Sequence, residues 1–207
     1  MARPRKVTDE RMLAAAAAVI GRAGPGFTLA DVAAQAQVSA GTLVHRFGSK
    51  HGLLLAMVRT AVEDTRREMS ALGAGDGDPL AALVRAIVER YAPLDDPATA
   101  ANNLAQLAAD LSDEALRAAM ADLYAAVRHG IGALLRRAVE AGALPGAPPV
   151  PVAARILAAT ADGTAIHWST HPHGGLRRRL ATDLDHILVG WRHAPAGAGP
   201  DTRGERR

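Results

Sequence analysis

The sequence has no cysteine among its 207 residues, which excludes disulfide bonds, thiolate metal sites and cysteine nucleophiles and fits a reducing compartment. It has no run of 18 apolar residues, so no membrane-spanning helix and no membrane partner is expected. The first residues, Met1 to Lys6, are basic and lack an apolar stretch, so no signal peptide is predicted. Together these absences favour a cytoplasmic protein.

Aromatic residues are also scarce, at 3% of the chain. No segment alternates aromatic or β-branched residues with polar ones, so the sequence does not predict strands. Alanine and leucine dominate instead, and apolar residues recur at intervals of three and four, which is the period of an amphipathic helix. Because 49% of the residues are hydrophobic, the chain can bury a sizeable core. The sequence therefore predicts an all-α fold.

Capping residues divide the chain into nine predicted helices. Thr8, Thr28, Ser39 and Ser49 each precede an apolar pattern and are predicted N-caps, and Asp31 completes a capping-box-like pair with Thr28. Three short helices are thus followed by a long one from residue 49, and then by helices near 79–92, 97–111, 112–141, 151–170 and 175–193. In the first helix the predicted apolar stripe is Leu13, Ala16, Ala17 and Ile20.

Positive charge is concentrated in the first quarter of the chain. Residues 1–50 contain seven Lys or Arg against three Asp or Glu, whereas the remaining residues contain 17 against 18. A basic head on a nearly neutral body favours a polyanionic partner at one end. A basic tail that only aids solubility would explain the charge before residue 7, but not Arg46 and Lys50, which lie inside a patterned segment.

Residues 28–47 have the pattern of a helix-turn-helix. Two short capped helices are joined by the very short connection Gln37-Val38. The second begins with small residues after Ser39, which allow its N-terminus to approach a DNA backbone closely. Leu43 and Phe47, four residues apart, are expected to face inward. A plain helical hairpin at the edge of a bundle is the alternative, and the concentrated positive charge argues against it.

Two segments carry a family resemblance. The stretches FTLADVA at 27–33 and VSAGTLVHRFGSK at 38–50, followed by a leucine-rich helix, resemble the TetR (tetracycline-repressor-like) family of regulators. The resemblance implies a homodimer that binds double-stranded DNA, with an unknown small-molecule effector and, by the family's usual mode, a repressor function. It implies a helix-turn-helix domain at 1–50, a ligand-binding and dimerisation domain at 51–194, and a tail at 195–207 that composition predicts to be disordered.

The resemblance also assigns individual residues. Ala40, Gly41 and Val44 match the family's base-facing positions, and Val44 stands where a tyrosine is usual. A valine cannot donate a hydrogen bond, so it would contact a thymine methyl group or nothing. The family's phosphate-contacting positions are matched by Thr42, Arg46 and Lys50, and His45 lies beside them. The predicted DNA-binding set also includes the N-caps of the two helices, Thr28 and Ser39.

A small molecule in a helical body lies between helices, in an apolar cavity with a few polar groups. Large side chains on the candidate helices include Leu104 and Ile166. The predicted ligand-binding set is Tyr91, Leu107, Met120, Tyr124, His129 and Trp168. Ordinary core packing is the alternative for each of them. The scarcity of charge on these faces favours an apolar or neutral compound, and the fourth helix, which joins head to body, is the expected lever.

The last two predicted helices favour a dimer interface. Small residues on the first would allow close helix approach: Ala153, Ala154, Ala158, Ala161 and Gly163. The second carries an apolar stripe at three-four spacing: Leu180, Leu184, Ile187, Leu188 and Trp191. Burial of this stripe within a single chain is the alternative. A constitutive DNA-binding protein without an effector also remains open at this point.

Neither a metal site nor an enzyme is predicted. His167 and His171 have a four-residue helical spacing that some metal sites use, and His173 follows, but Pro172 shows that the helix ends there. We therefore interpret them as helix-end histidines. An enzyme could pair a carboxylate with His129 as a general base, but the sequence has no nucleophile motif and no phosphate-binding loop. No catalytic residue and no cofactor is therefore expected.

Overall fold

The computed structural model describes residues 8–75 and 77–193, and every regular element in this part of the chain is helical. The head contains α1 (Asp9–Ala23), α2 (Leu29–Ala36) and α3 (Ala40–Phe47), with a 3₁₀ turn η1 (Gly24–Gly26) after α1. The body contains a second 3₁₀ turn, η2 (Ala92–Leu94), and six helices, which are α4 (Lys50–Gly73), α5 (Pro79–Arg90), α6 (Pro97–Ser112), α7 (Glu114–Glu140), α8 (Val150–Thr170) and α9 (Leu176–Trp191). The predicted all-α fold is confirmed.

The predicted N-caps start the first four helices. The hydroxyls of Thr8, Ser39 and Ser49 each accept a backbone N–H of the helix that follows. At α2 the Thr28 hydroxyl accepts the Asp31 N–H at 3.2 Å, while the Asp31 carboxylate accepts the Thr28 N–H at 2.7 Å. Both bonds of a capping box are therefore present, and they satisfy donors that a helix N-terminus leaves unpaired.

The buried face of α1 differs in part from its predicted stripe. Ala17 is exposed and Leu13 is only partly buried, whereas Ala16 and Ile20 are buried as predicted. The buried face comprises Met12, Ala15, Ala16, Val19, Ile20 and Gly21. The reason is tertiary, because α1 packs against α6 of the body as well as against α2. A helix with partners on two sides turns a different face inward than one packed only within the head.

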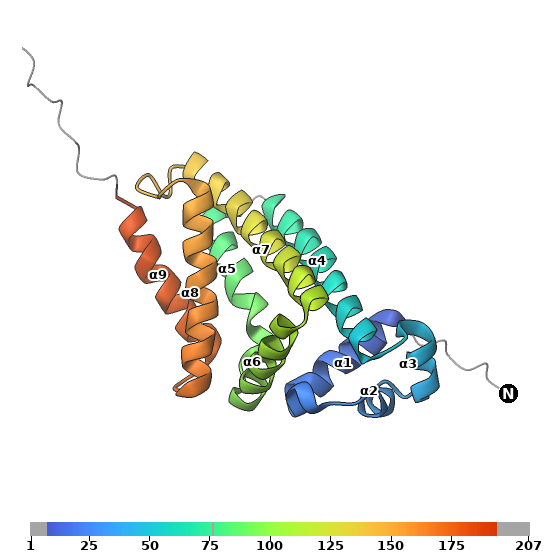
Figure 1. The fold of residues 1–207 in the computed structure, drawn as a ribbon. Helices are drawn as coiled ribbons and strands as arrows, with labels where there is room; N and C mark the ends of the chain where they lie inside the picture. The colour runs from blue at the N-terminus through green and yellow to red at the C-terminus, as the bar shows by residue number, and fades with distance from the viewer. Residues whose placement is uncertain (1–7, 76, 194–207) are drawn as a thin grey trace, which may run out of the picture.

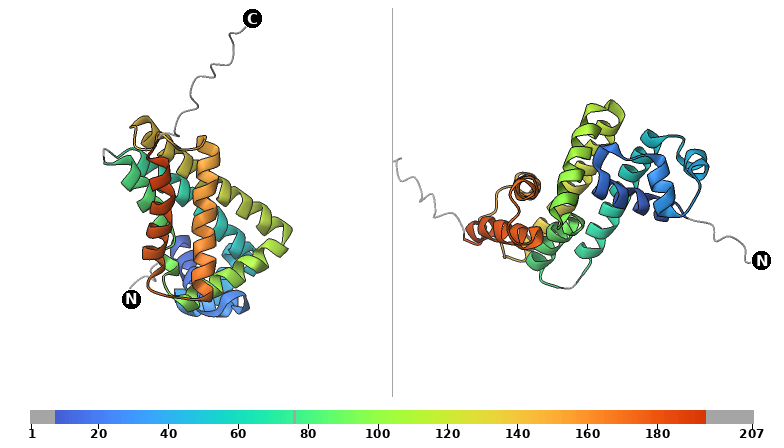
Figure 2. Two further views of the ribbon diagram at one scale, coloured as in Figure 1. Left: turned by 90° about the vertical axis from the view of Figure 1, so that its left-hand side faces the viewer. Right: turned by 90° about the horizontal axis from the view of Figure 1, so that it is seen from below.

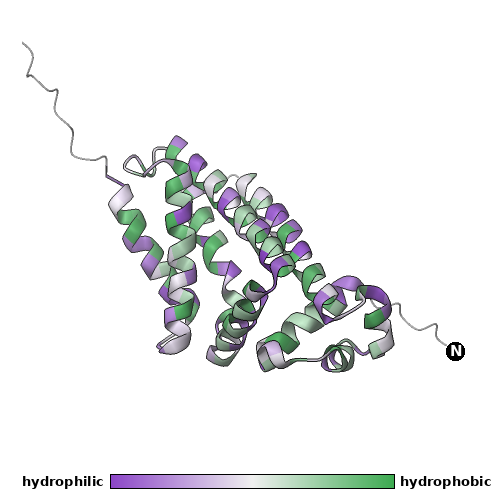
Figure 3. Ribbon diagram, viewed as in Figure 1, coloured by the Kyte–Doolittle hydropathy of each residue, from purple (hydrophilic) through white to green (hydrophobic). Residues whose placement is uncertain are grey.

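Two hydrophobic cores follow the two parts of the chain. The head core gathers residues of α1, α2 and α3 with Leu53 and Leu54 of α4, and the body core begins farther along α4 at Val58. Helix α4 therefore belongs to both and joins head to body (Figure 1). Hydrophobic and hydrophilic residues alternate around the helices, as amphipathic helices require (Figure 3).

Helices α8 and α9 form the side of the body farthest from the head (Figures 1 and 2). The leucine stripe predicted for an interface lies inside the chain, since Leu180, Leu184 and Leu188 are at most 1% exposed within the body core. Ala153, Ala154 and Ala161 are likewise buried in this chain. Large apolar residues remain exposed on the same two helices: Val152, Ile166 and Val189.

Candidate functional site

Helix α3 presents the predicted recognition face to solvent. Leu43 is completely buried and Phe47 partly buried, which anchors the opposite face of the helix in the head core. The predicted base- and phosphate-facing residues on this helix are all exposed: Ala40, Gly41, Thr42, Val44, His45 and Arg46. Val44 is 48% exposed, although a valine is normally buried. This helix face is therefore free to enter a groove.

The turn between α2 and α3 is sharp because Gln37 adopts the left-handed conformation, with φ 59° and ψ 44°. Its N–H group and that of Val38 bond back to carbonyls of α2, which closes the end of that helix. Ser39 then starts α3 at once, accepting the Thr42 N–H at 3.1 Å. The two helices thus have the fixed relative orientation of a helix-turn-helix.

Arg46 is paired with the first turn of α1. Its Nε lies 2.7 Å from Asp9 Oδ1 and its Nη2 lies 2.6 Å from Asp9 Oδ2, a two-pronged contact. The side chains are 58% and 38% exposed, respectively. The carboxylate raises the pKa of Arg46, so the guanidinium stays charged. This ion pair links α3 to α1 and partly neutralises the positive charge of Arg46, which is predicted to contact phosphate.

Lys50 lies at the start of α4, beneath the turn that follows α1. Its Nζ donates to the carbonyl oxygens of Pro25 at 2.7 Å and of Phe27 at 2.6 Å. An ammonium group has three donors, so one remains for a phosphate. Thr28, also predicted to bind DNA, is exposed next to this contact as the N-cap of α2. These geometries leave the DNA-binding assignments as predictions.

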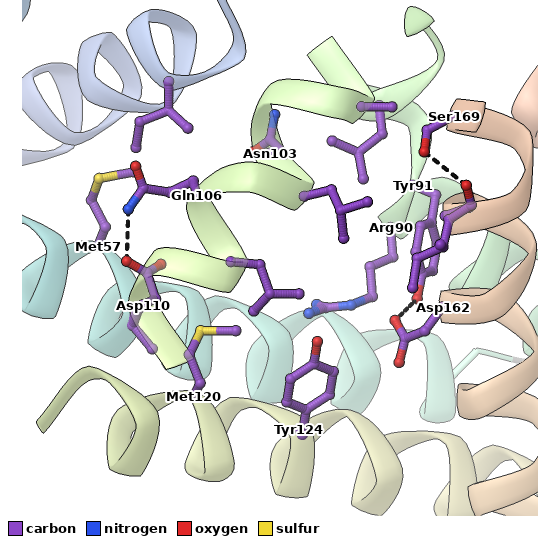
Figure 4. Close-up of a pocket in the computed structure, with 18 of the residues that line it drawn as sticks. Met57, Arg90, Tyr91, Asn103, Gln106, Asp110, Met120, Tyr124, Asp162 and Ser169 are labelled. Atoms are coloured by element: carbon purple, nitrogen blue, oxygen red, sulfur yellow. Dashed lines mark hydrogen bonds between the residues drawn. The ribbon is translucent and has the colours of Figure 1, made fainter. Parts of the chain in front are cut away.

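A cavity of about 410 Å³ lies inside the body and reaches the head. We call it the central cavity. It is bounded by α1, α4, α5, α6, α7 and α8. Its lining includes Met57, Arg90, Tyr91, Asn103, Gln106, Asp110, Met120, Tyr124 and Asp162 (Figure 4). Its size is within the range of small-molecule sites. Of the predicted ligand-binding residues, Tyr91, Leu107, Met120 and Tyr124 line it.

At the α8 side of the central cavity, Tyr91 and Asp162 form a partly buried polar pair. The Tyr91 hydroxyl donates to Asp162 Oδ1 at 2.5 Å. Burial raises the pKa of Asp162, while the Tyr91 bond and the nearby Arg90 charge lower it. Burial and the Asp162 charge also raise the pKa of Tyr91, so its hydroxyl stays protonated and acts as a donor. Arg90 itself donates to Thr65 at 3.1 Å.

At the head side of the cavity, Gln106 and Asp110 lie four residues apart on α6. Gln106 Nε2 donates to Asp110 Oδ1 at 2.7 Å, and both residues are buried, at 6% and 7% exposed. Burial raises the pKa of Asp110, against the hydrogen bond from Gln106. Neither residue was among those predicted to bind a ligand. Their spacing on one helix face was the available signal.

Helix α6 also touches the head directly. Asn102 Nδ2 donates to the carbonyl oxygen of Gly21 at 2.9 Å. A side chain at Gly21 would press on Thr99, because a Cβ there would lie 3.1 Å from Thr99 Cγ2. Gly24, at φ +58°, meets Asn102 from the following turn. One helix therefore carries cavity residues on one side and head contacts on another.

Two predicted ligand-binding residues do not line the central cavity. Trp168 is buried and donates to the Gly174 carbonyl at 3.1 Å. His129 lines a separate hollow of about 1050 Å³ between α4 and α7, with Arg66 and Arg136. In the ranges that the structure describes, no group of three or more potential metal-ligating residues is found, and no helix is long and apolar enough to cross a membrane. His167, His171 and His173 are exposed at the end of α8.

Comparison with known families identifies both parts of the chain. Residues 12–57 match the family described as bacterial regulatory proteins, tetR family, and residues 80–190 match the C-terminal domain of BetI-type transcriptional repressors. The chain belongs to the TetR family. The resemblance noted from the sequence is thereby confirmed, and the match to the second family extends it to the body.

Individual relatives agree with this assignment. The HTH-type transcriptional regulator BetI of Burkholderia mallei is 36% identical over 85 residues, which are 41% of this chain and 44% of the relative, so the match spans less than half of the relative's length. A transcriptional regulator from Rhodococcus sp. Rha1 is 27% identical, with TM-score 0.68, over 91% of this chain and all of the other.

A third comparison concerns the fold alone. SmeT, described as the repressor of the Stenotrophomonas maltophilia multidrug efflux pump SmeDEF, has been solved as a complex with triclosan. That complex has TM-score 0.67 and 21% identity over 91% of this chain and 95% of SmeT. The arrangement of head and body is therefore shared across members of low sequence identity.

Proposed function

We propose that this TetR-family protein is a repressor that binds a palindromic DNA site as a homodimer and is released when a small molecule occupies the central cavity. The observation that carries the proposal is the position of α6. It lines the cavity with Asn103, Gln106 and Asp110, and it contacts the head through Asn102. A molecule that alters the position of α6 would therefore act directly on the DNA-binding head.

DNA recognition is assigned to the exposed face of α3. Gly41 and Ala40 leave the start of the helix without bulk, so its backbone can approach the duplex. Val44 contributes an apolar contact, which in the major groove fits a thymine methyl group. Thr42, His45, Arg46 and the remaining donor of Lys50 serve the phosphates, and these contacts set orientation rather than sequence preference.

The homodimer is assigned to the outer side of α8 and α9. The inner leucines are used within the chain, but Val152 and Val189 remain 37% and 42% exposed on these two helices. A two-fold axis through this surface would place the heads at the two ends of the dimer, because the head lies at the opposite side of the body (Figure 1). Two recognition helices about 34–36 Å apart would meet successive major grooves.

Release follows from differential binding to two head arrangements. An effector lowers DNA affinity only to the extent that it prefers the arrangement that does not fit DNA, which in allosteric proteins amounts to about 1–3 kcal/mol. Helix α4, the lever expected from the sequence, lines the cavity with Leu54, Met57 and Val58, and α6 adds a second connection. The SmeT complex with triclosan is consistent with a small-molecule site in a body of this fold.

The test is selection of DNA from a random pool with the purified protein at physiological salt. A recovered palindrome, followed by release of that DNA when a cavity-binding compound is added, would support every part of the proposal. Binding that enriches no sequence and disappears as salt rises would contradict it, because only non-specific phosphate attraction would remain. A palindrome that no cavity ligand releases would favour the constitutive alternative.

A further inference from the structure

An unpaired hydrogen-bond acceptor lies in the wall of the central cavity at its head-side end, on a residue that lines the cavity. Gln106 Oε1 is the only buried side-chain nitrogen or oxygen without a hydrogen-bond partner in the part of the chain that the structure describes. Gln106 is 94% buried and lines the cavity, and its Nε2 already donates to Asp110. A buried polar atom left unpaired is costly, by about 1–3 kcal/mol, so in native proteins such an atom usually gains a partner from a water, an ion or a ligand.

The atom beside it is also an acceptor. Asp110 is 93% buried, and only its Oδ1 receives the Gln106 bond. The charged groups that bear on this carboxylate are Lys50, which favours its ionised form, and Asp113, which opposes it. No side chain forms a salt bridge with Asp110 in the described ranges. A buried carboxylate without a paired cation, next to an unpaired amide oxygen, is complementary to a cation with N–H donors.

Apart from Asn103, whose Nδ2 already donates to the Thr99 carbonyl, the rest of the wall at this end is apolar. Met57 of α4 and Met120 of α7 line it (Figure 4), as do Ile20 of the head and Leu54 of α4. These side chains offer no hydrogen bond to a second polar group, so the remainder of a ligand here must be mostly hydrocarbon. The chemistry of the site is thus one donor-bearing positive group at the Gln106–Asp110 pair and an apolar body.

We propose that the Gln106–Asp110 pair binds the protonated amine of a predominantly apolar effector. The N–H groups donate to Gln106 Oε1 and to the Asp110 carboxylate, while the hydrocarbon part lies among the apolar residues of the central cavity. This inference rests on the proposed function in taking that cavity as the effector site. It replaces the neutral compound expected from the sequence, which could not reveal that Asp110 is buried in the cavity wall.

Competing ligand chemistries fit the pair less well. A quaternary ammonium group carries the charge but has no N–H, so it leaves Gln106 Oε1 unpaired. A neutral alcohol has a donor but leaves the carboxylate without a cation. The other cavity carboxylate, Asp162, is less suited to a cation because it already accepts from Tyr91 and lies near Arg90, whose positive charge opposes a second one.

The experiment compares three eight-carbon probes by titration calorimetry at neutral pH: octylamine, octan-1-ol and octyltrimethylammonium. Octylamine should bind about tenfold or more tightly than either of the other two, because only it provides both charge and donors. Equal affinities for octylamine and octan-1-ol would overturn the proposal. So would a preference for the quaternary compound, since that would show recognition of charge without hydrogen bonding.

Two variants locate the amine. Asp110→Asn keeps an oxygen for the Gln106 bond but removes the charge, and Gln106→Met removes the unpaired oxygen at similar size. Each variant should bind octylamine about tenfold more weakly than the parent protein does, whereas its affinity for octan-1-ol should change little. Asp122→Asn, an exposed carboxylate on α7, is the matched control and should change neither. Loss of octylamine binding in Asp162→Asn, but not in Asp110→Asn, would overturn the assignment to this end of the cavity.

A DNA readout separates this inference from the proposed function. Fluorescence anisotropy is measured with the palindrome recovered by selection. Octylamine binding that depends on Asp110 without release of DNA would support the amine site and contradict the repressor mechanism. Release of DNA by octan-1-ol with no advantage for octylamine would support the repressor mechanism and overturn the amine site. Thermal unfolding of each variant confirms that the compared proteins are folded.

Discussion

The Nζ atom of Lys50 lies 4.0 Å from the centre of the Phe27 ring and donates a hydrogen bond to the Phe27 carbonyl oxygen at 2.6 Å. The same ammonium donates to the Pro25 carbonyl. One cation at the first residue of α4 thus holds the turn between α1 and α2 through two charged hydrogen bonds and a cation–π contact. Lys50 therefore has a structural role in the head in addition to the phosphate contact predicted for it.

Replacing Lys50 by Met should separate these two roles. The change keeps an apolar stem but removes the ammonium, so the free energy of unfolding should fall by about 2 kcal/mol in denaturant titrations. The salt dependence of DNA binding should also fall by about one unit of slope. Arg59→Met, an exposed cation on the same helix, is the control. Full stability in Lys50→Met would show that the carbonyl contacts contribute nothing.

Freeing Arg46 from Asp9 should strengthen DNA binding. Asp9→Asn removes the carboxylate that occupies the guanidinium, and an exposed pair of this kind is worth about 0.2–1 kcal/mol, so affinity should rise by up to about fivefold. Glu10→Gln changes the net charge equally, in the same turn of α1, without touching Arg46. The gain should therefore be smaller in that control and should disappear when Asp9→Asn is combined with Arg46→Ala.

Val44 should determine sequence preference without affecting salt dependence. Val44→Ala shortens the exposed apolar side chain of α3 and should cost about 1 kcal/mol at one symmetry-related base pair of the palindrome. The measurement is binding to DNA probes changed at single positions. Because no charge is altered, the salt slope should match that of the unmodified protein. A uniform loss at every position would instead indicate a structural defect in α3.

Asn102→Ala should uncouple the cavity from the head. The substitution removes the hydrogen bond from α6 to Gly21 but leaves the cavity wall intact, so effector affinity in the absence of DNA should change less than twofold. The effector's influence on DNA affinity should fall about fivefold, equivalent to about 1 kcal/mol of coupling. Gln35→Ala, which removes a hydrogen bond to Arg22 within the head, is the control. Unaltered coupling in Asn102→Ala would leave α4 as the lever.

Asp110→Asn should stabilise the effector-free protein in a pH-dependent way. Burial raises the pKa of Asp110 in the folded protein, so protonation of this carboxyl group stabilises the fold. This stabilisation is complete below the unfolded pKa of about 4 and is lost as pH rises through the folded pKa. The opposing influences of Lys50 and Gln106 do not reverse this direction. The variant should unfold at a higher temperature than the parent at pH 7, and the difference should shrink near pH 4. A constant difference across this range would contradict the prediction.

Local signals in the sequence were sufficient for the helices and the recognition helix. The hydroxyls of Thr28 and Ser39 cap the segments they were expected to cap, because capping is decided within four residues of chain. Leu43 was expected to face inward and is fully buried, since it shares one face of this short helix with Phe47, four residues along. The DNA-binding residues were assigned from the resemblance of this segment to the TetR family, and those assignments stay predictions.

Contacts between distant segments could not be predicted in this way. The partner of Arg46 is 37 residues away, and that of Asn102 is 81 residues away. Trp168 and His129 were expected at the ligand site because of size and polarity, but periodicity does not specify which of several neighbouring helices a residue faces. The burial of Leu184 inside the chain, rather than at an interface, has the same cause.

The sequence by itself determined the all-α class, the order of the helices, their caps and the helix-turn-helix, because each depends on propensity and spacing over a few residues. Only the tertiary structure decided that α6 connects the cavity to the head, that Gln106 and Asp110 form a buried acceptor pair, and that Lys50 holds the turn after α1. These features arise where helices far apart in the chain pack together, and packing determines which polar atoms lose water and which gain partners.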